Sequence, residues 1–309
     1  MPHDHSHAHG SGGHHHHISP DAGDARVAGA IAVNLLLTVA QIIGGIFAGS
    51  LSLIADALHN LSDAIALIIA FGARKIARRP ADARMTFGYN RIEVVAALIN
   101  YTTLIIIGFY LVYEAVLRFF EPTDVAGWII VWVAGFALLV DLVTAALVWR
   151  MQAGSVNMRA AFLHNVADAL GSIAVIVAGT VILLFGWMWV DPLVTLLIAG
   201  YILWQSAVEM PRVVRILMLG SPEGLDTHAV IDAVEEAPGV ASAHHVHLWM
   251  MGENDPALDA HLVLENGAAA DPTRKAVRDV LAGFGIAHST LEIETVETAC
   301  RDSARIGHG

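Results

Sequence analysis

Two segments of the chain carry the same pair of metal-binding residue types at the same spacing. Leu58–Ile65 contains His59 and Asp63, and Leu163–Leu170 contains His164 and Asp168, both within the pattern H-N-x-x-D-A. Positions i and i+4 lie on one face of a helix, so each segment directs an imidazole and a carboxylate toward one point. Two such helices facing each other supply two nitrogen and two oxygen ligands, a four-coordinate set suited to Zn²⁺.

The charge of these four side chains predicts that the site exchanges a metal ion for protons. Two carboxylates and two neutral imidazoles sum to −2, which one divalent cation neutralises. Without the metal, carboxylates in a low-dielectric environment take up protons instead, so metal and protons compete for the same groups. A membrane site that exchanges a metal ion for protons is that of an antiporter.

The composition indicates that these segments lie in a membrane. Of 309 residues 56% are hydrophobic and 15% are charged, and the mean hydropathy is +0.60. Soluble domains are less apolar and more charged, which excludes an ordinary globular enzyme and a disordered chain. A formal net charge of −12 leaves no basic surface for nucleic acid. Cys300 is the single cysteine and has no internal disulfide partner.

Six apolar runs of membrane-spanning length are expected, each needing roughly 20 residues. Two fall within residues 27–73, and the others cover about residues 92–119, 125–149, 160–185 and 189–208. With the N-terminus inside, the inner segments hold eleven Lys and Arg residues and the outer ones only Arg118. Because basic loops stay on the cytoplasmic side, both termini are expected in the cytoplasm, with the protein in the cell's inner membrane. The N-terminus does not resemble a signal peptide.

Three domains follow from this pattern. We expect residues 1–25 to form a disordered, His-rich cytoplasmic tail and residues 26–210 to form a six-helix transmembrane domain. Residues 211–309 are expected to form a cytoplasmic α/β domain with the order helix, strand, strand, helix, strand (αββαβ). The first seventeen residues contain eight histidines. They either capture zinc weakly or form a dispensable tail, and the sequence leaves both interpretations open.

Two further carboxylates lie inside the apolar runs. Asp56 precedes His59 by one helical turn, and Asp141 lies in the fourth run. Each either relays protons or accepts a hydrogen bond that orients a neighbouring group.

Longer motifs resemble the cation diffusion facilitator family of metal transporters, zinc-transporting type. The segments that carry the resemblance are Gly49–His59 (GSLSLIADALH), Phe87–Glu93 (FGYNRIE), Leu219–Gly224 (LGSPEG) and His244–Trp249 (HHVHLW). The resemblance covers nearly the whole chain after residue 26. It implies six transmembrane helices, a metallochaperone-like cytoplasmic domain, a homodimer and proton-coupled export of Zn²⁺, often also of Cd²⁺ or Co²⁺.

The same resemblance assigns metal ligands. Carried over by position, His59, Asp63, His164 and Asp168 are the transport ligands, and His244, His261 and His288 are ligands in the cytoplasmic domain. We expect one metal ion per cytoplasmic domain, with two as the alternative, in a regulatory or structural role. His245 and His247 follow His244 in the same predicted strand, and each is either an additional ligand or an ordinary surface or core histidine. We expect His247 on the side of His244 and His245 on the opposite side.

An integral-membrane zinc hydrolase is the main alternative. Such an enzyme needs an open coordination position and a nearby general base. The sequence contains no H-E-x-x-H motif, and no Glu lies in the second or fifth run. Transport is therefore favoured over an enzyme, and a membrane metal sensor has little support.

Overall fold

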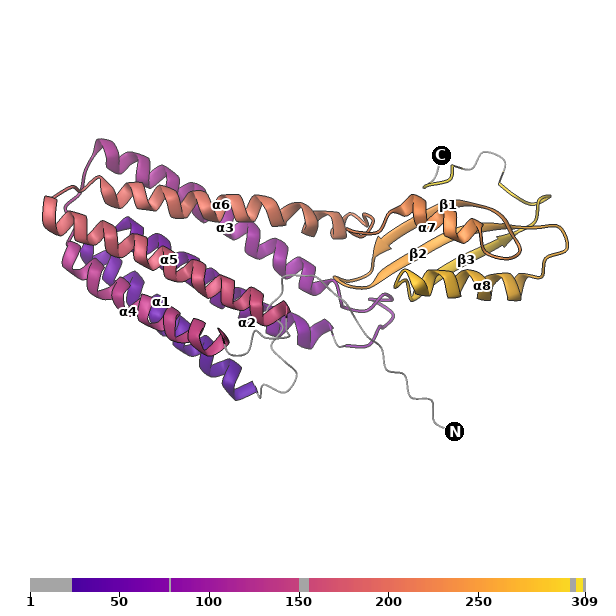
Figure 1. The fold of residues 1–309 in the computed structure, drawn as a ribbon, viewed down its shortest axis with the longest axis horizontal. Helices are drawn as coiled ribbons and strands as arrows, with labels where there is room; N and C mark the ends of the chain where they lie inside the picture. The colour runs from indigo at the N-terminus through magenta and orange to yellow at the C-terminus, as the bar shows by residue number, and fades with distance from the viewer. Residues whose placement is uncertain (1–23, 78, 150–155, 301–303, 308–309) are drawn as a thin grey trace. The chain divides into compact units, whose positions relative to one another are not determined.

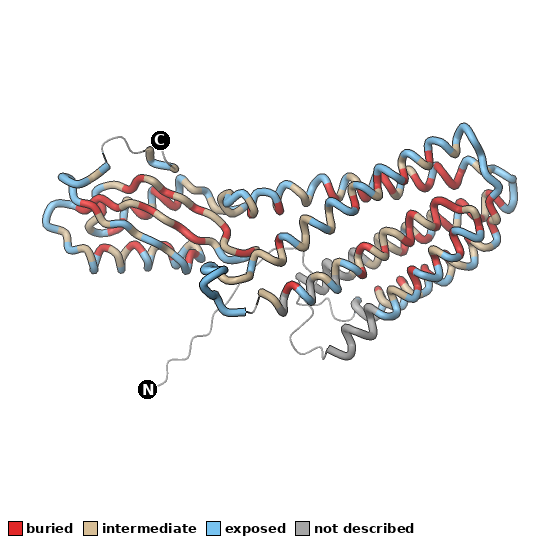
Figure 2. Tube along the Cα trace, turned by 180° about the vertical axis from the view of Figure 1, so that it is seen from behind, coloured by how far each residue is buried: buried red, intermediate tan, exposed pale blue. Residues whose placement is uncertain are grey.

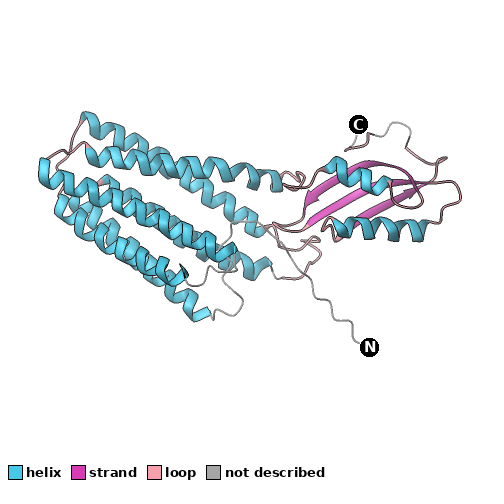
Figure 3. Ribbon diagram, in the orientation of Figure 1, coloured by secondary structure: helices cyan, strands magenta, loops and turns pink. Residues whose placement is uncertain are grey.

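The computed structural model describes residues 24–77, 79–149, 156–300 and 304–307. Of the predicted N-terminal tail, residues 1–23 lie outside the described residues, and the first helix begins at Asp24. Within the described residues, six long helices precede a small sheet with two short helices (Figure 3). The long helices are α1 (Asp24–Ala48), α2 (Leu51–Ala77), α3 (Ile92–Phe120), α4 (Gly127–Trp149), α5 (Val156–Phe185) and α6 (Val190–Leu217), labelled in Figure 1.

Four of these helices are long and apolar enough to cross a membrane. They are α3, α4 over Gly127–Ala146, α5 over Asn165–Phe185, and α6. In α1, the stretch Ala32–Ala48 is apolar but shorter. The protein is thus a multi-pass membrane protein, and the remaining two expected spans, in α1 and α2, stay a prediction.

The described residues divide into two compact units. Those of Met1–Phe71 and Ile99–Glu209 form one unit, and those of Gly72–Leu98 and Met210–Gly309 form the second. The second unit therefore also includes residues 72–98, which the sequence assigns to the transmembrane domain. There, the Arg91 guanidinium donates to the carbonyl oxygens of Met250 and Met251, at 2.9 and 3.2 Å.

Apolar packing holds the helices of the first unit together, with buried residues along their inward faces (Figure 2). One cluster joins α1, α2, α4, α5 and α6, and includes Leu53, Ile130 and Val175, each fully buried. A second cluster joins α2, α3 and α6 through small residues such as Ala55 and Ala199. Both α2 and α6 take part in both clusters, so these two helices connect the two groups.

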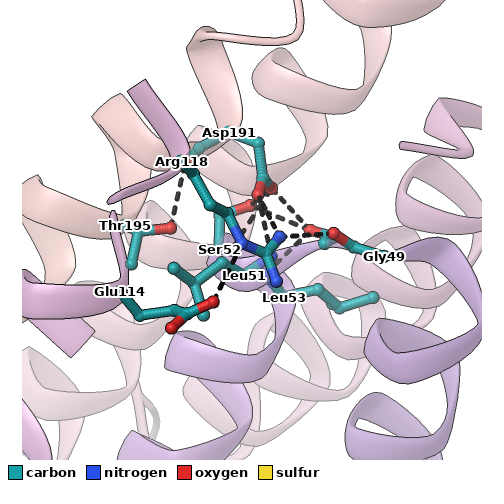
Figure 4. Close-up of polar contacts among 9 residues, drawn as sticks. Gly49, Leu51, Ser52, Leu53, Glu114, Arg118, Asp191 and Thr195 are labelled. Atoms are coloured by element: carbon teal, nitrogen blue, oxygen red, sulfur yellow. Dashed lines mark hydrogen bonds and ion pairs between the residues drawn. The ribbon is translucent and has the colours of Figure 1, made fainter. Parts of the chain in front are cut away.

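A buried polar cluster fixes the start of α2, and we call it the Asp191 cluster (Figure 4). The Asp191 carboxylate, in the first turn of α6, is fully buried. It accepts hydrogen bonds from the Ser50 and Ser52 hydroxyls, both at 2.6 Å, and from the Leu51 amide at 2.7 Å. An anion is favourable here because the first amides of a helix have no partner within the helix.

Arg118, from the last turn of α3, completes the Asp191 cluster. Its guanidinium lies 3.8 Å from Asp191 and 3.5 Å from Glu114, and it donates to the Gly49 carbonyl oxygen. Ser50 also caps α2, because its hydroxyl accepts from the Leu53 amide at 3.2 Å. The cluster thus connects the α1–α2 turn to both α3 and α6, and α2 is the helix that carries His59 and Asp63.

The second unit contains a three-stranded sheet in the order β1-β2-β3. Strands β1 (Val240–Met250) and β2 (Pro256–Leu264) are antiparallel, and β3 (His288–Glu294) is parallel to β2. Helices α7 (Thr227–Glu235) and α8 (Ala270–Gly283) pack against the sheet through Ile231, Val277 and Leu281, which meet Leu258 and Leu262. Since side chains alternate along a strand, His261 lies on the face opposite Leu262.

Candidate metal centres

Three of the four predicted transport ligands come together between α2 and α5. The Nε2 atom of His59 lies 3.8 Å from Asp63 Oδ2 and 3.5 Å from Asp168 Oδ1. Ligand atoms around a tetrahedral Zn²⁺ are separated by about 3.3–3.6 Å, given metal–ligand bonds near 2.0–2.2 Å. Small movements of these side chains would therefore allow all three to coordinate one zinc ion.

His164, the fourth predicted ligand, has its backbone in α5 one turn before Asp168. Its side chain lies outside the described residues. The helical i, i+4 spacing puts His164 and Asp168 on the same face of α5.

The environment of these side chains is largely closed to solvent. His59, Asp63 and Asp168 have side-chain exposures of 12%, 26% and 10%. Two carboxylates this close in a poorly hydrated site repel each other and need a cation or protons to neutralise them. The site can thus hold a divalent cation or, in its absence, protons.

A polar chain next to the site connects α2 to α1. Gln41 donates from Nε2 to Asp56 at 2.7 Å, and its Oε1 atom accepts from Asn60 Nδ2 at 3.2 Å. All three side chains are buried. Gln41 thus binds Asp56 and Asn60, which precede and follow His59 in α2. The sequence alone did not indicate a role for Gln41. This contact to a neutral amide supports an orienting role for Asp56.

Asp141 of α4 accepts a hydrogen bond from the Ser172 hydroxyl of α5 at 3.1 Å. Gly171 precedes Ser172 in α5, and a Cβ atom added at Gly171 would lie 3.2 Å from the Asp56 carboxylate. Glycine at position 171 therefore leaves room for Asp56 against α5.

A second group of metal-binding side chains lies in the sheet unit. His244, His245, His261 and Cys300 each offer a ligand atom, and these atoms all lie within 4.8 Å of one another. We call this group the tail cluster. Glu294 lies beside it, with one oxygen 2.7 Å from His261 Nδ1 and the other 3.2 Å from His244 Nε2. Nitrogen and thiolate ligands suit Zn²⁺ and softer ions such as Cd²⁺.

An irregularity in β1 brings His245 into the tail cluster. His244 pairs with His261, but the register between β1 and β2 shifts before His247, which pairs with Asp259. His245 has a φ of +50°, a left-handed conformation that costs energy for a residue with a Cβ. The expected position of His245 is therefore wrong, because a bulge adds a residue to β1 and redirects this side chain. His247, paired with Asp259 two residues from His261, lies on the same face as His244, as expected.

The structure does not bring His288 to the tail cluster. His288 is exposed at the first position of β3, opposite Ala257, which lies four residues before His261 on β2. At about 3.3 Å per residue, this separates His288 from His261 by roughly 13 Å along the sheet. Within the described residues, Glu294 and Cys300 lie where the sequence analysis expected His288.

The Glu294 carboxyl is stabilised in its charged form by the groups around it. Burial alone would raise the pKa of its carboxyl, but hydrogen bonds from His261 and the Cys300 amide bring that pKa below its ordinary value. For Cys300, an exposed residue, partial desolvation of the thiol and its hydrogen bond to Glu294 raise the pKa of the thiol. A metal ion that binds Cys300 as a thiolate must therefore displace a proton.

Two models of protein families match the chain. The cation efflux transmembrane domain model matches residues 27–218. The model of the cation efflux protein cytoplasmic domain matches residues 222–296.

Three relatives are similar over most of the chain. The cadmium, cobalt and zinc/H(+)-K(+) antiporter of Bacillus subtilis is 35% identical over 265 residues, covering 83% of this chain and 84% of that protein. The metal cation efflux system protein CzcD of Cupriavidus metallidurans is 33% identical over 290 residues, covering 93% and 91%. The zinc transporter ZitB of Escherichia coli is 33% identical over 283 residues, covering 89% and 88%.

Proposed function

Because this chain belongs to the cation diffusion facilitator family of metal transporters, we propose that it exports Zn²⁺ from the cytoplasm in exchange for protons. Cd²⁺ and Co²⁺ are further substrates. The transport ligands are His59, Asp63, His164 and Asp168. The observation that carries the proposal is the 3.5 Å distance from His59 Nε2 on α2 to Asp168 Oδ1 on α5.

The exchange follows from charge balance at this site. Zn²⁺ neutralises the two carboxylates, and neutral imidazole nitrogens complete its coordination. When the metal leaves, the carboxylates and imidazoles recover protons, because an unneutralised site is costly in a membrane. Protons entering from the outer side are released to the cytoplasm when the next metal ion binds, which couples the two fluxes.

The membrane arrangement is proposed as six spans, with α1 and α2 as the two additional ones. Both termini lie on the cytoplasmic side of the inner membrane. Support comes from the distribution of Lys and Arg, eleven in the inner segments against Arg118 in the outer ones. Residues 26–210 are the transmembrane domain and residues 211–309 the cytoplasmic domain, through which two chains form a homodimer.

The tail cluster is proposed to bind one regulatory Zn²⁺ per chain. Its ligands are drawn from His244, His245, His261 and Cys300, with Glu294 beside them. His288, which is exposed at the start of β3, is not part of this set. The support is the mutual proximity of four ligand atoms within 4.8 Å and the strained backbone of His245.

A membrane zinc hydrolase is not favoured. The family and the relatives are transporters, and four protein ligands leave no open position on the metal for a catalytic water.

Purified protein reconstituted into vesicles tests the proposal. With an acidic lumen and external Zn²⁺, proton efflux should drive zinc into the lumen, where a trapped fluorescent chelator reports it. Dissipating the pH gradient should abolish accumulation. Because one relative is named for exchange with H⁺ and K⁺, matched vesicles contain either K⁺ or an organic cation. Zinc accumulation that is independent of the pH gradient would refute proton coupling.

A further inference from the structure

Tyr201, on α6, contacts the ring of a proposed metal ligand. The ring centroids of Tyr201 and His59 are 6.1 Å apart, and the two planes are inclined by 81°. This is an edge-to-face arrangement within the usual range for aromatic pairs. None of the four proposed ligands lies on α6, so this contact connects a third helix to the site formed by α2 and α5.

Packing of α6 on α2 determines where the Tyr201 ring lies. Ala199 of α6 and Ala55 of α2 belong to the same buried cluster, and small side chains allow two helices to approach closely. Ile202 is almost fully buried, whereas Tyr201 is 41% exposed. Tyr201 therefore lies at the edge of the buried face of α6, beside the turn of α2 that carries His59.

A second aromatic contact supports the Tyr201 ring from within α6. Trp204 lies one turn further along the helix, with its ring centroid 6.2 Å from that of Tyr201. The Tyr201 ring thus has Trp204 and His59 as aromatic neighbours. A ring held in this way restricts the rotation of the imidazole, and with it the direction of Nε2 toward Asp63 and Asp168.

From this geometry we propose that Tyr201 is a positioning residue of the transport site. It does not bind the metal. It holds the His59 imidazole in the orientation that zinc requires, so that less conformational freedom is lost when the ion binds. The inference rests on the proposed function, because it takes His59 as a transport ligand.

Transport kinetics of full-length variants in vesicles test this role. An aromatic pair contributes about 0.5–1.5 kcal/mol, so Tyr201→Leu should raise the KM for zinc by about two- to twelvefold. The maximal rate should change less. Tyr201→Phe, which keeps the ring, should retain the wild-type KM. Tyr110→Leu, which removes an exposed tyrosine of α3, is the matched control and should also retain it.

The pattern of KM values separates positioning from a general structural defect. A folding defect lowers the number of active transporters and hence the maximal rate, but leaves the KM unchanged. Tyr201→Met serves as a second variant without the ring if the leucine variant does not fold. A wild-type KM in the folded variants lacking the ring would overturn the inference. An equal rise in Tyr201→Phe would also overturn it, because the hydroxyl would then be the important group.

His59→Ala distinguishes this inference from the proposed function. Loss of zinc transport in His59→Ala, together with a wild-type KM in Tyr201→Leu, rejects the role of Tyr201 alone. Normal zinc transport in His59→Ala rejects the transport site itself.

Discussion

The Nε2 atom of His59 lies 3.5 Å from the Oδ1 atom of Asp168, although the two residues belong to different helices, α2 and α5. Within α2, the same nitrogen lies 3.8 Å from Asp63. One imidazole therefore lies between two carboxylates of separate helices. The charge and the hardness of these three side chains can be changed one at a time.

Removing one charge from this group should stop zinc transport. Asp168→Asn keeps the shape of the side chain but leaves the zinc-loaded site with an excess positive charge. We expect zinc uptake into vesicles to fall by at least about tenfold, because loss of a residue that only orients a metal ligand already costs about 10–100-fold. Asp279→Asn, which alters an exposed carboxylate of α8, should transport normally. Equal rates in the two variants would contradict a role for Asp168.

Replacing the nitrogen ligand with oxygen should change metal selectivity. In His59→Asp the site gains a hard ligand, so Mn²⁺ should be transported more readily relative to Zn²⁺. Uptake of the two metals into vesicles, measured in competition, gives the ratio. His228→Asp, at an exposed position in α7, is the control. An unchanged ratio in His59→Asp would count against ligand hardness as the basis of selection.

Loss of the central carboxylate of the Asp191 cluster should destabilise the protein. Asp191→Ala leaves the part-buried Arg118 and the first amides of α2 without their shared acceptor. Breaking a buried ion pair on one side costs about 3–5 kcal/mol, so the thermal midpoint in detergent should drop clearly. Glu114→Gln removes the more exposed partner of Arg118 and should cost less than about 1 kcal/mol. Similar thermal midpoints for the two variants would contradict a central role for the Asp191 carboxylate in stability.

Metal content distinguishes the ligands of the tail cluster from His288. His261→Ala and Cys300→Ser should each lose about one zinc ion per chain, measured by mass spectrometry of the purified protein. His288→Ala should retain the wild-type content, since its side chain is exposed and distant along the sheet. A loss in His288→Ala alone would restore the ligand set inferred from the family resemblance.

The stability of the second unit should depend on pH through Glu253. This residue lies in the β1–β2 connection, and burial raises its pKa from 4.5 to about 7, with Arg212 opposing the shift and Glu93 adding to it. Between these two values the folded protein holds a proton that the unfolded chain has released, so the free energy of unfolding falls as the pH rises.

Thermal midpoints between pH 5 and 8 measure this dependence. The wild-type midpoint should decline across this range, and Glu253→Gln should decline less. Glu265→Gln, at an exposed position, should follow the wild type. Parallel curves for wild type and Glu253→Gln would refute the contribution of Glu253.

The sequence predicts the grouping of His59, Asp63 and Asp168 better than that of the tail cluster, and the reason is physical. His59, Asp63 and Asp168 follow from helical spacing and from the repetition of one motif, both of which are local. The tail ligands depend on strand register, where one additional residue reverses the faces. No local pattern marks the bulge at His245 or the approach of Cys300 to His261.

Contacts between distant segments account for the other residues that the sequence analysis missed. Gln41 is one of several polar residues in the mostly apolar helix α1. Only the packing of α1 on α2 reveals its hydrogen bonds to Asp56 and Asn60. Likewise, nothing next to Asp191 in the sequence indicates Ser50 and Ser52 as its partners. The division into apolar helices and a tail with a small sheet depends on composition and periodicity, and the sequence does predict it.

The Asp191 cluster also has a consequence for biosynthesis. Ser50, Leu51 and Ser52 bind a carboxylate that lies 139 to 141 residues further along the chain. At the pace of a ribosome, that acceptor is translated roughly 7 to 28 seconds after its donors. A nascent chain that stops before α6 therefore lacks the carboxylate that accepts from Ser50, Leu51 and Ser52, and the start of α2 reaches its final hydrogen bonding only after α6 has been made.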